Sequence, residues 1–292
     1  MLLVTFAEDS REAIGVLDRH AGEVVDFSQA APQLPADMLG LIQLGAEGLA
    51  RARAAVASGA GRLPADSVRL LAPLPRPPRN ILCVGKNYRD HAKEVKSLPA
   101  GSDDIPKVPI FFTKATSSVI GPGEAIPSWL DPRDSTDYEG ELGVVIGAGG
   151  RGISREEAMD HVYGYTIVND ATSRGLQREH AQWFLGKSLD GYCPMGPAIL
   201  TADAVPDVDA LQLQTRVNGE LRQNGRLADL IFDIPDLIET LSSVMRLEPG
   251  DVIATGTPAG VGMGFKPPRF LHKGDVVAIT IEPVGTLENP VE

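Results

Sequence analysis

Short apolar runs separated by turn residues predict that this chain is rich in strands. Near the N-terminus, such runs predict strands over 1–7, 13–18 and 23–28. Further along, they predict strands over 80–85, 109–114, 140–147, 163–169, 198–202, 211–219, 251–256 and 275–282. Strands and helices do not alternate regularly, so we expect a mostly antiparallel α+β fold without βαβ units.

Helices are expected to be fewer than strands. Apolar residues at helical spacing in an alanine-rich stretch predict a helix over 39–58. Other helical stretches are expected at 88–95, 154–160, 172–183 and 235–245. Asp233 stands where the last of these helices needs an N-cap. Asn218 and Gly219 lie between two strand-like runs and predict a two-residue hairpin turn.

A proline-rich stretch at 73–79, PLPRPPR, favours a domain boundary. Proline continues neither a helix nor a central strand, and it favours an extended connection. We therefore expect a small N-terminal α+β domain over 1–72 and a larger domain over 73–292. The alternative is a proline-rich loop within a single domain.

Composition and charge limit the possible partners. The net charge of -12 and the pI near 4.9 argue against nucleic acid and anionic membranes, which would be repelled. Only two cysteines occur, the N-terminus lacks a basic leader, and no apolar run approaches the ~20 residues that span a bilayer. We expect a cytoplasmic protein. A small anionic substrate would need a metal or a few well-placed Lys and Arg residues.

The stretch DYEGELGVVIG at 137–147 carries two acids into an apolar strand. Glu139 and Glu141 are two residues apart, so both carboxylates lie on one face of the strand. Burying them without a partner would be costly, so the pair indicates a bound cation. Asp170 closes a later strand and is the best third ligand. Three carboxylates favour Mg²⁺ or Mn²⁺ over zinc, and Ca²⁺ also fits. The alternative is an edge strand whose glutamates face water.

Three other motifs suggest chemistry, each with a plain structural alternative. His91 and Glu94 share a helix face, which suits a general base, although a solvated helix face would show the same pattern. Lys187 lies in a GKS sequence. This is not a P-loop, because position 181, where the first glycine of that motif must stand, is alanine. Lys187 is therefore expected either to bind an oxyanion or to be a surface residue. The glycine-rich stretch 254–264 either binds an anion through its N–H groups and Thr257, or is a simple turn.

Six segments, taken in order along the chain, resemble the motifs of one known protein family. They are GKNYRDHAKE, DYEGELGVVIG, GYTIVNDATSRGLQ, FLGKSLDGYCPMGP, VNGELRQNG and ATGTPAGVGMGFKPPRFLHKGD. From residue 79 to the C-terminus the chain resembles the fumarylacetoacetate hydrolase family, in its bacterial acylpyruvase and 2-hydroxyhepta-2,4-diene-1,7-dioate isomerase branch. The resemblance implies a mixed β-roll after the small N-terminal domain and a homodimer, although a tetramer would fit as well. The glycine, aspartates and prolines between His91 and Val108 predict a lid.

The resemblance also implies roles for individual residues. Magnesium or manganese would be held by Glu139, Glu141 and Asp170. The pair His91 and Glu94 would orient and deprotonate water, and Lys187 would bind a substrate oxygen. The implied contacts to substrate carboxylate or keto oxygens are Lys114, Arg174, Gln177 and Thr257. One departure is Gly175, which stands where many relatives carry an acid, and which puts the local support of Arg174 in question.

These roles predict a metal-dependent hydrolase that cleaves a carbon–carbon bond in acylpyruvates or related β-diketo acids, in catabolism such as aromatic degradation. Oxaloacetate-type decarboxylation and isomerisation or hydration of unsaturated 2-oxo acids need the same enolate-stabilising site and remain alternatives. A non-catalytic module that binds an oxo acid is a further alternative, although it would not need a base.

Overall fold

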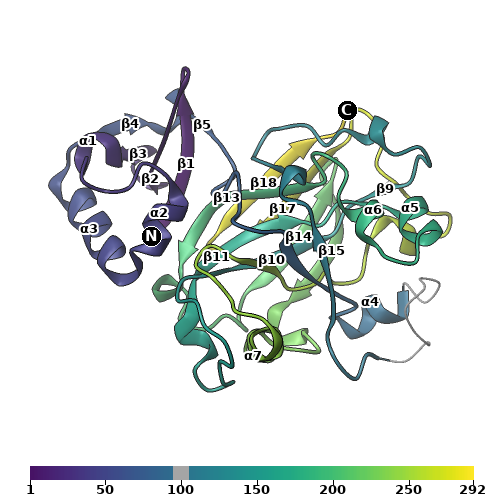
Figure 1. Cartoon of the computed structure of the whole chain (residues 1–292). Coiled ribbons are helices and arrows are strands. Elements are labelled where there is room, and N and C mark those ends of the chain that lie inside the picture. Colours follow the sequence, from purple (N-terminus) through teal and green to yellow (C-terminus); the bar gives the residue numbers. More distant parts are fainter. Residues whose placement is uncertain (95–104) are drawn as a thin grey trace.

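The computed structural model describes residues 1–94 and 105–292 and confirms a strand-rich α+β fold. In this described part, the largest sheet has the strand order β4-β3-β2-β1-β13-β11-β10-β16-β6-β7. Figure 1 shows the N-terminal elements as a lobe beside the main body. Most of the expected lid between His91 and Val108 lies outside the described residues.

The lobe contains short strands and three helices. They are β1 (Leu2–Glu8), β2 (Arg11–Asp18), β3 (Glu23–Asp26), α1 (Phe27–Ala30), α2 (Met38–Gln43), α3 (Gly45–Ser58), β4 (Arg62–Pro64) and β5 (Arg69–Leu70). The prediction of one continuous helix over 39–58 is wrong, because α2 and α3 are separate helices. Gly45 has a φ of +53°, which a continuous right-handed helix does not allow.

The lobe shares a sheet and a core with the rest of the chain. Strand β1 pairs antiparallel with β13 (Cys193–Thr201), Leu3 opposite Ile199. The N-terminal amino group donates to Oγ1 of Thr201 at 2.7 Å. Leu3 and Phe27 belong to the same apolar cluster as Val145 and Ile199. The proposed boundary near residue 72 falls between β5 and β6 and stays a prediction.

The central part of the chain contributes the strands that carry the acids. Its elements are β6 (Ile81–Gly85), α4 (Arg89–Glu94), β7 (Ile110–Lys114), β8 (Val119–Ile120), β9 (Thr136–Asp137), β10 (Gly140–Ile146), β11 (Val162–Asn169), β12 (Thr172–Ser173), α5 (Arg174–Glu179) and α6 (Phe184–Lys187). Strand β10 lies between β11 and β16 (Val252–Ala254), and every one of its residues is buried. The edge-strand alternative is therefore wrong.

A second sheet covers the inner face of β10 and β11. It has the order β15-β14-β17-β18, from β14 (Gln212–Val217), β15 (Glu220–Arg226), β17 (Val276–Ile281) and β18 (Gly285–Pro290). Leu142 and Ile167 share an apolar cluster with Leu213 and Ile279 of this sheet. The predicted hairpin is confirmed, since Asn218 and Gly219 join β14 to β15 with φ of 52° and 81°.

Two predicted helices differ from the structure. Over 154–160 no α-helix forms, and the stretch ends in a short 3₁₀ turn, Ala158–His161. Arg155 bonds through its N–H to Glu239 of α7 (Ile234–Val244), and through its guanidinium to Asp236 of that helix and to Asp233, its N-cap. The stretch 172–183 divides into β12, α5 and a break before α6. The N-cap prediction is confirmed, since Asp233 accepts the N–H of Asp236 at 3.0 Å.

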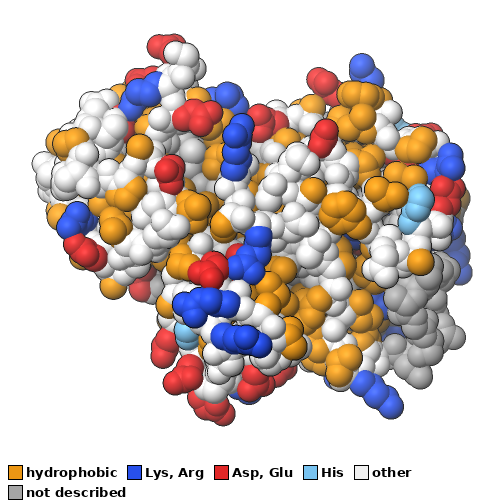
Figure 2. Space-filling model, viewed as in Figure 1, with side chains coloured by type: hydrophobic (Ala, Val, Ile, Leu, Met, Phe, Trp, Pro, Cys, Tyr) orange, Lys and Arg blue, Asp and Glu red, His pale blue; other side chains and the backbone are white. Residues whose placement is uncertain are grey.

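Two observations concern the apolar character of the helices and the charge of the surface. Within residues 1–94 and 105–292, none of the helices has the length and apolar character needed to cross a bilayer. Figure 2 shows acidic and basic side chains mixed over the visible face, with no extended field of one sign.

Candidate metal centre and catalytic cavity

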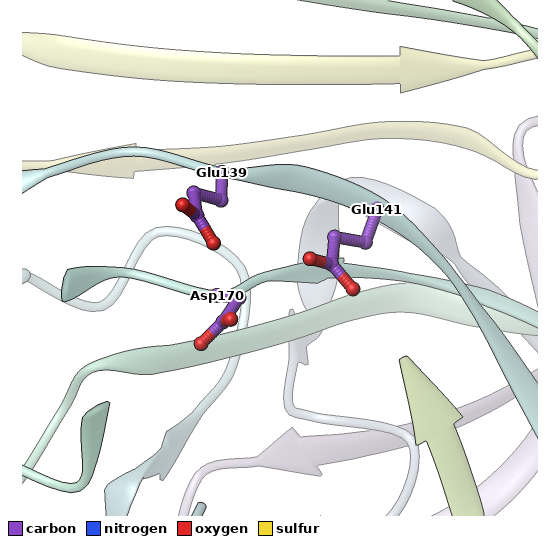
Figure 3. Close-up of side chains that lie close together, drawn as sticks. All are labelled: Glu139, Glu141 and Asp170. Carbon is purple, nitrogen blue, oxygen red and sulfur yellow. The ribbon is translucent and has the colours of Figure 1, made fainter. Parts of the chain in front are cut away.

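The pairing of β10 with β11 brings the three predicted acids together. Gly140 lies opposite Asn169, and the N–H of Asp170 donates to the carbonyl of Glu139 at 2.8 Å. One oxygen from each of Glu139, Glu141 and Asp170 lies within 4.8 Å of the others, and all three residues are buried. Figure 3 shows the glutamates extending from one side of their strand toward Asp170.

Two buried lysines bond to two of these acids, Glu139 and Asp170. The Nζ of Lys187 lies 2.7 Å from Oε2 of Glu139 and 2.5 Å from Oδ2 of Asp170. The Nζ of Lys114 lies 2.7 Å from the other oxygen of Asp170 and donates to the carbonyl of Ala171 at 2.9 Å. Lys187 is therefore no surface residue. Both ammonium groups orient Asp170.

Arg174 is fully buried and connects the acids to the helix α5. Its Nη2 lies 2.6 Å from Oε1 of Glu139, and its Nε donates to Oδ2 of Asp137 at 2.8 Å. Its Nη1 donates to Oε1 of Gln177 at 3.1 Å, which sets the amide of that side chain. The glycine at 175 does not disturb this arrangement: the Gly175 N–H is held by Ser135 Oγ at 2.9 Å.

Charge is distributed unevenly among the three acids. Burial alone would raise the pKa of Glu139, but Arg174 and Lys187 outweigh it and lower that pKa below its usual value. Burial raises the pKa of Glu141 well above its usual value, and repulsion by Asp170 and Glu139 adds to the effect. The carboxylate of Glu141 accepts the N–H of Gly256 at 2.8 Å. Among residues 1–94 and 105–292, Glu141 forms no ion pair like those of Glu139 with Arg174 and Lys187.

The donor set fits a hard divalent cation. Three buried carboxylates converge, and the negative charge of Glu141 is compensated least. Oxygen ligands of this kind suit Mg²⁺ or Mn²⁺, and cysteine and histidine are absent from the cluster. The buried acidic triad can therefore bind a divalent metal ion.

The helix α4 places His91 beside this centre. His91 is only 4% exposed, which excludes the solvated-face alternative. Its Nδ1 lies 3.3 Å from Oε2 of Glu94, one turn later. Glu94 in turn accepts the N–H of Gly260, which belongs to the glycine-rich loop (residues 254–264).

A small cavity of about 20 Å³ joins most of these groups. Its lining includes His91, Glu139, Glu141, Arg174, Gln177, Lys187 and Thr257. Phe112 and Trp183 complete one wall, with ring centroids 5.2 Å apart in an edge-to-face arrangement. Sequence reasoning missed these two aromatics. Neither stands in a motif, and only folding brings β7 next to the start of α6.

Two residues predicted to contact substrate, Thr257 and Lys114, have hydrogen-bond partners within the protein. The hydroxyl of Thr257 donates to the carbonyl of Gly140 at 2.8 Å and accepts from Nε2 of Gln223 at 2.7 Å. Lys114 is not among the residues that line the cavity. Their roles toward substrate stay predictions. Sequence reasoning also missed Gln223, which is fully buried and additionally accepts the N–H of Gly140 at 3.0 Å.

The two cysteines are unsuited to nucleophilic chemistry. Cys83 and Cys193 are both fully buried and unpaired. Burial raises the pKa of Cys193 to about 12 and that of Cys83 well above its usual value. At neutral pH both remain thiols, which are poor nucleophiles and poor metal ligands.

Comparisons with known proteins identify sequences similar to this chain. The family model of the fumarylacetoacetate (FAA) hydrolase C-terminal domain matches residues 80–292. Oxaloacetate tautomerase YisK of Bacillus subtilis is 55% identical over 226 residues, which are 77% of this chain and 74% of that protein.

Several solved structures are similar over the whole chain, among them two hydrolases. Fumarylacetoacetate hydrolase from Exiguobacterium antarcticum is 46% identical, with a TM-score of 0.85 and coverage of 100% of this chain and 99% of that chain. Maleylpyruvate hydrolase from Sphingobium sp. SYK-6, solved with manganese(II) and pyruvate, is 33% identical, with a TM-score of 0.81 and coverage of 100% and 98%.

Proposed function

Because this chain belongs to the fumarylacetoacetate hydrolase family, we propose that it is a divalent-metal-dependent enzyme that converts a small 2-oxo acid through its enolate. The reaction that we favour is keto–enol tautomerisation of an oxaloacetate-like acid. The observation that carries the proposal is the burial of His91, paired with Glu94, in the same cavity as Glu139 and Glu141. Identity of 55% with an oxaloacetate tautomerase supports the choice of substrate.

The residues of the site are assigned to metal binding and to substrate binding. Glu139, Glu141 and Asp170 would hold Mg²⁺ or Mn²⁺, which supplies a Lewis acid that stabilises negative charge on the oxo oxygen of the substrate. The substrate carboxylate is assigned to Arg174 and Gln177, which line the cavity and whose side chains orient each other.

Proton transfer is assigned to His91. Its imidazole would take a proton from the carbon next to the oxo group and deliver it to the oxo oxygen, which gives the enol, and the reverse transfer would regenerate the keto form. Glu94, through its contact with Nδ1, sets the orientation of the ring. Lys187 and Lys114 keep the carboxylate of Asp170 turned toward Glu139 and Glu141.

A second candidate is hydrolysis of a carbon–carbon bond in an acylpyruvate or related β-diketo acid. The His91–Glu94 pair favours it, because a histidine with a glutamate partner can also deprotonate a water molecule. A maleylpyruvate hydrolase among the similar structures supports the same reading. Such a reaction would use the same metal, Arg174 and Lys187.

The test is an assay of the purified protein with Mg²⁺ or Mn²⁺. Oxaloacetate tautomerisation is followed by the ultraviolet absorbance of the enol, acetylpyruvate hydrolysis by acetate release, and decarboxylation by CO₂ release. We expect tautomerisation to fall by about 10²-fold or more in His91→Ala, with unchanged Mn²⁺ binding. His20→Ala, an exposed histidine of the lobe, is the control.

The assay separates the candidates. Acetate release that needs His91, without tautomerase activity, would support the hydrolase. Activity that survives in His91→Ala would refute the role of this histidine in either reaction.

A further inference from the structure

Glu94 contacts His91 on one side and the glycine-rich loop on the other. Its Oε2 lies 3.3 Å from Nδ1 of His91. The N–H of Gly260 donates to both carboxylate oxygens, at 3.0 Å to Oε1 and 3.2 Å to Oε2. The side chain of Glu94 is 16% exposed, so these contacts are largely shielded from water. The orientation of the carboxylate toward His91 therefore depends on the position of Gly260.

A second glycine of the loop leaves the space that Glu94 fills. A Cβ atom at Gly264 would lie 2.0 Å from Oε1 of Glu94 and 2.4 Å from its Cγ, so no larger residue fits while Glu94 keeps this position. Gly260 needs glycine for a different reason. Its φ is +108°, and a Cβ atom there would lie 1.9 Å from the carbonyl oxygen of Arg222.

The loop is itself fastened to the segment that carries the metal ligands. The hydroxyl of Tyr138 donates to the carbonyl of Gly260 at 2.9 Å. The carboxylate of Asp137 accepts the N–H of Gly262 at 2.6 Å and that of Met263 at 3.0 Å. Both side chains stand directly before Glu139 in the sequence. Through these contacts, the glycine-rich loop connects the carboxylate of Glu94 to the segment that carries Glu139.

From these contacts we propose that Gly260 and Gly264 are positioning residues for the His91–Glu94 pair. The N–H of Gly260 holds the carboxylate of Glu94, and the absence of a side chain at Gly264 admits it. The inference rests on the proposed function, in which His91 transfers the proton. It adds that the alignment of His91 with the metal centre is set by the glycine-rich loop and not by α4 alone.

The variant Gly264→Ala tests the proposal. The three atoms nearest to the new methyl group belong to the flexible side chain of Glu94, so that side chain can move away while the backbone stays in place. We expect kcat to fall by roughly tenfold to hundredfold, a part of the ~10²–10⁴ that a positioned base contributes. KM and Mn²⁺ affinity should stay unchanged. Gly150→Ala is the matched control, because the atom nearest to its Cβ would also belong to a side chain, Cγ1 of Ile153 at 2.9 Å, and not to Glu94.

A double-mutant cycle with Glu94→Ala separates positioning from general disruption. Without the glutamate side chain, alanine at 264 has room, so Gly264→Ala should lower kcat no further in the Glu94→Ala background. Equal losses in both backgrounds would overturn the proposal, because Gly264 would then act through another group. Full kcat in Gly264→Ala alone would also overturn it.

A spectroscopic measurement tests the same geometry without catalysis. The ¹⁵N chemical shift of His91 Nδ1 should change in Gly264→Ala in the same direction as in Glu94→Ala, and should not change in Gly150→Ala. An unchanged shift in Gly264→Ala would refute the positioning role. If the shifts change but His91→Ala keeps its activity, the proposed function has failed and the positioning inference stands.

Discussion

The ammonium of Lys187, the last residue of α6, lies 2.7 Å from Oε2 of Glu139, the residue directly before β10. Because both groups are buried, removing one of them would leave the charge of the other uncompensated, which makes the loss of either group costly. Burial alone would lower the pKa of Lys187, but Asp170 and Glu139 outweigh it and raise that pKa. The lysine is therefore charged and stabilises the acidic cluster.

Replacing Lys187 by methionine should destabilise the metal-free protein by about 3–5 kcal/mol, because Glu139 and Asp170 lose a buried cation. Mn²⁺ should raise the Tm of this variant more than that of the wild type, since the ion can neutralise the same carboxylates. Thermal unfolding with EDTA and with Mn²⁺ measures both effects. Lys93→Met, at an exposed ion pair, is the control, and equal Tm values for the two variants would contradict the prediction.

The two glutamates of the strand should respond differently to amide substitution. Glu139→Gln leaves Arg174 and Lys187 without their carboxylate, so the Tm in EDTA should fall. Glu141→Gln removes a charge that forms no such ion pair among the described residues, so the Tm in EDTA should stay the same or rise. Both should weaken Mn²⁺ binding by roughly tenfold or more, measured by calorimetry. A larger loss of Tm in Glu141→Gln would refute this account of the charges.

Asp233 should make stability depend on pH. Burial alone would raise its pKa, but the bonds from Arg155 and from the N–H of Asp236 outweigh it and lower that pKa. A lowered pKa in the folded state means that the stabilisation is present above the unfolded value, ~3.9, and is lost as the pH falls through the folded value. Asp233→Ala should cost about 0.5–2 kcal/mol at pH 7. The difference in Tm from wild type should shrink below about pH 4, and a constant difference would argue against it.

Removing residues 1–72 tests the proposed domain boundary. The truncation exposes the edge of β13 where β1 pairs with it, and removes the apolar partners of Val145 and Ile199. Exposed strand edges promote association. We expect the 73–292 protein to aggregate, as judged by size-exclusion chromatography. A monodisperse, cooperatively folding fragment would instead show that the lobe is an independent domain.

Much of the candidate site was predictable from local pattern. Glu139 and Glu141 share a face because strand residues alternate, and that rule needs no knowledge of the fold. His91 and Glu94 share a face because helix residues three apart do so. Asn218-Gly219 and the cap at Asp233 were likewise readable, since each depends on the conformation of a few neighbouring residues.

Features set by distant contacts were not predictable in this way. Arg155 is drawn to α7, and the helix expected around it does not form. The hydroxyl of Thr257 bonds to the carbonyl of Gly140, more than a hundred residues earlier, and no local pattern predicts that contact. The wall of Phe112 and Trp183 joins segments with no shared motif.

The sequence by itself determined the acids, the base, and the strand and helix faces on which they stand, because these depend on backbone periodicity. Only the tertiary structure decided which cation holds which acid, and that Gly260 and Gly264 receive Glu94. Such contacts join residues far apart in the chain, and their geometry depends on the packing of whole sheets and loops.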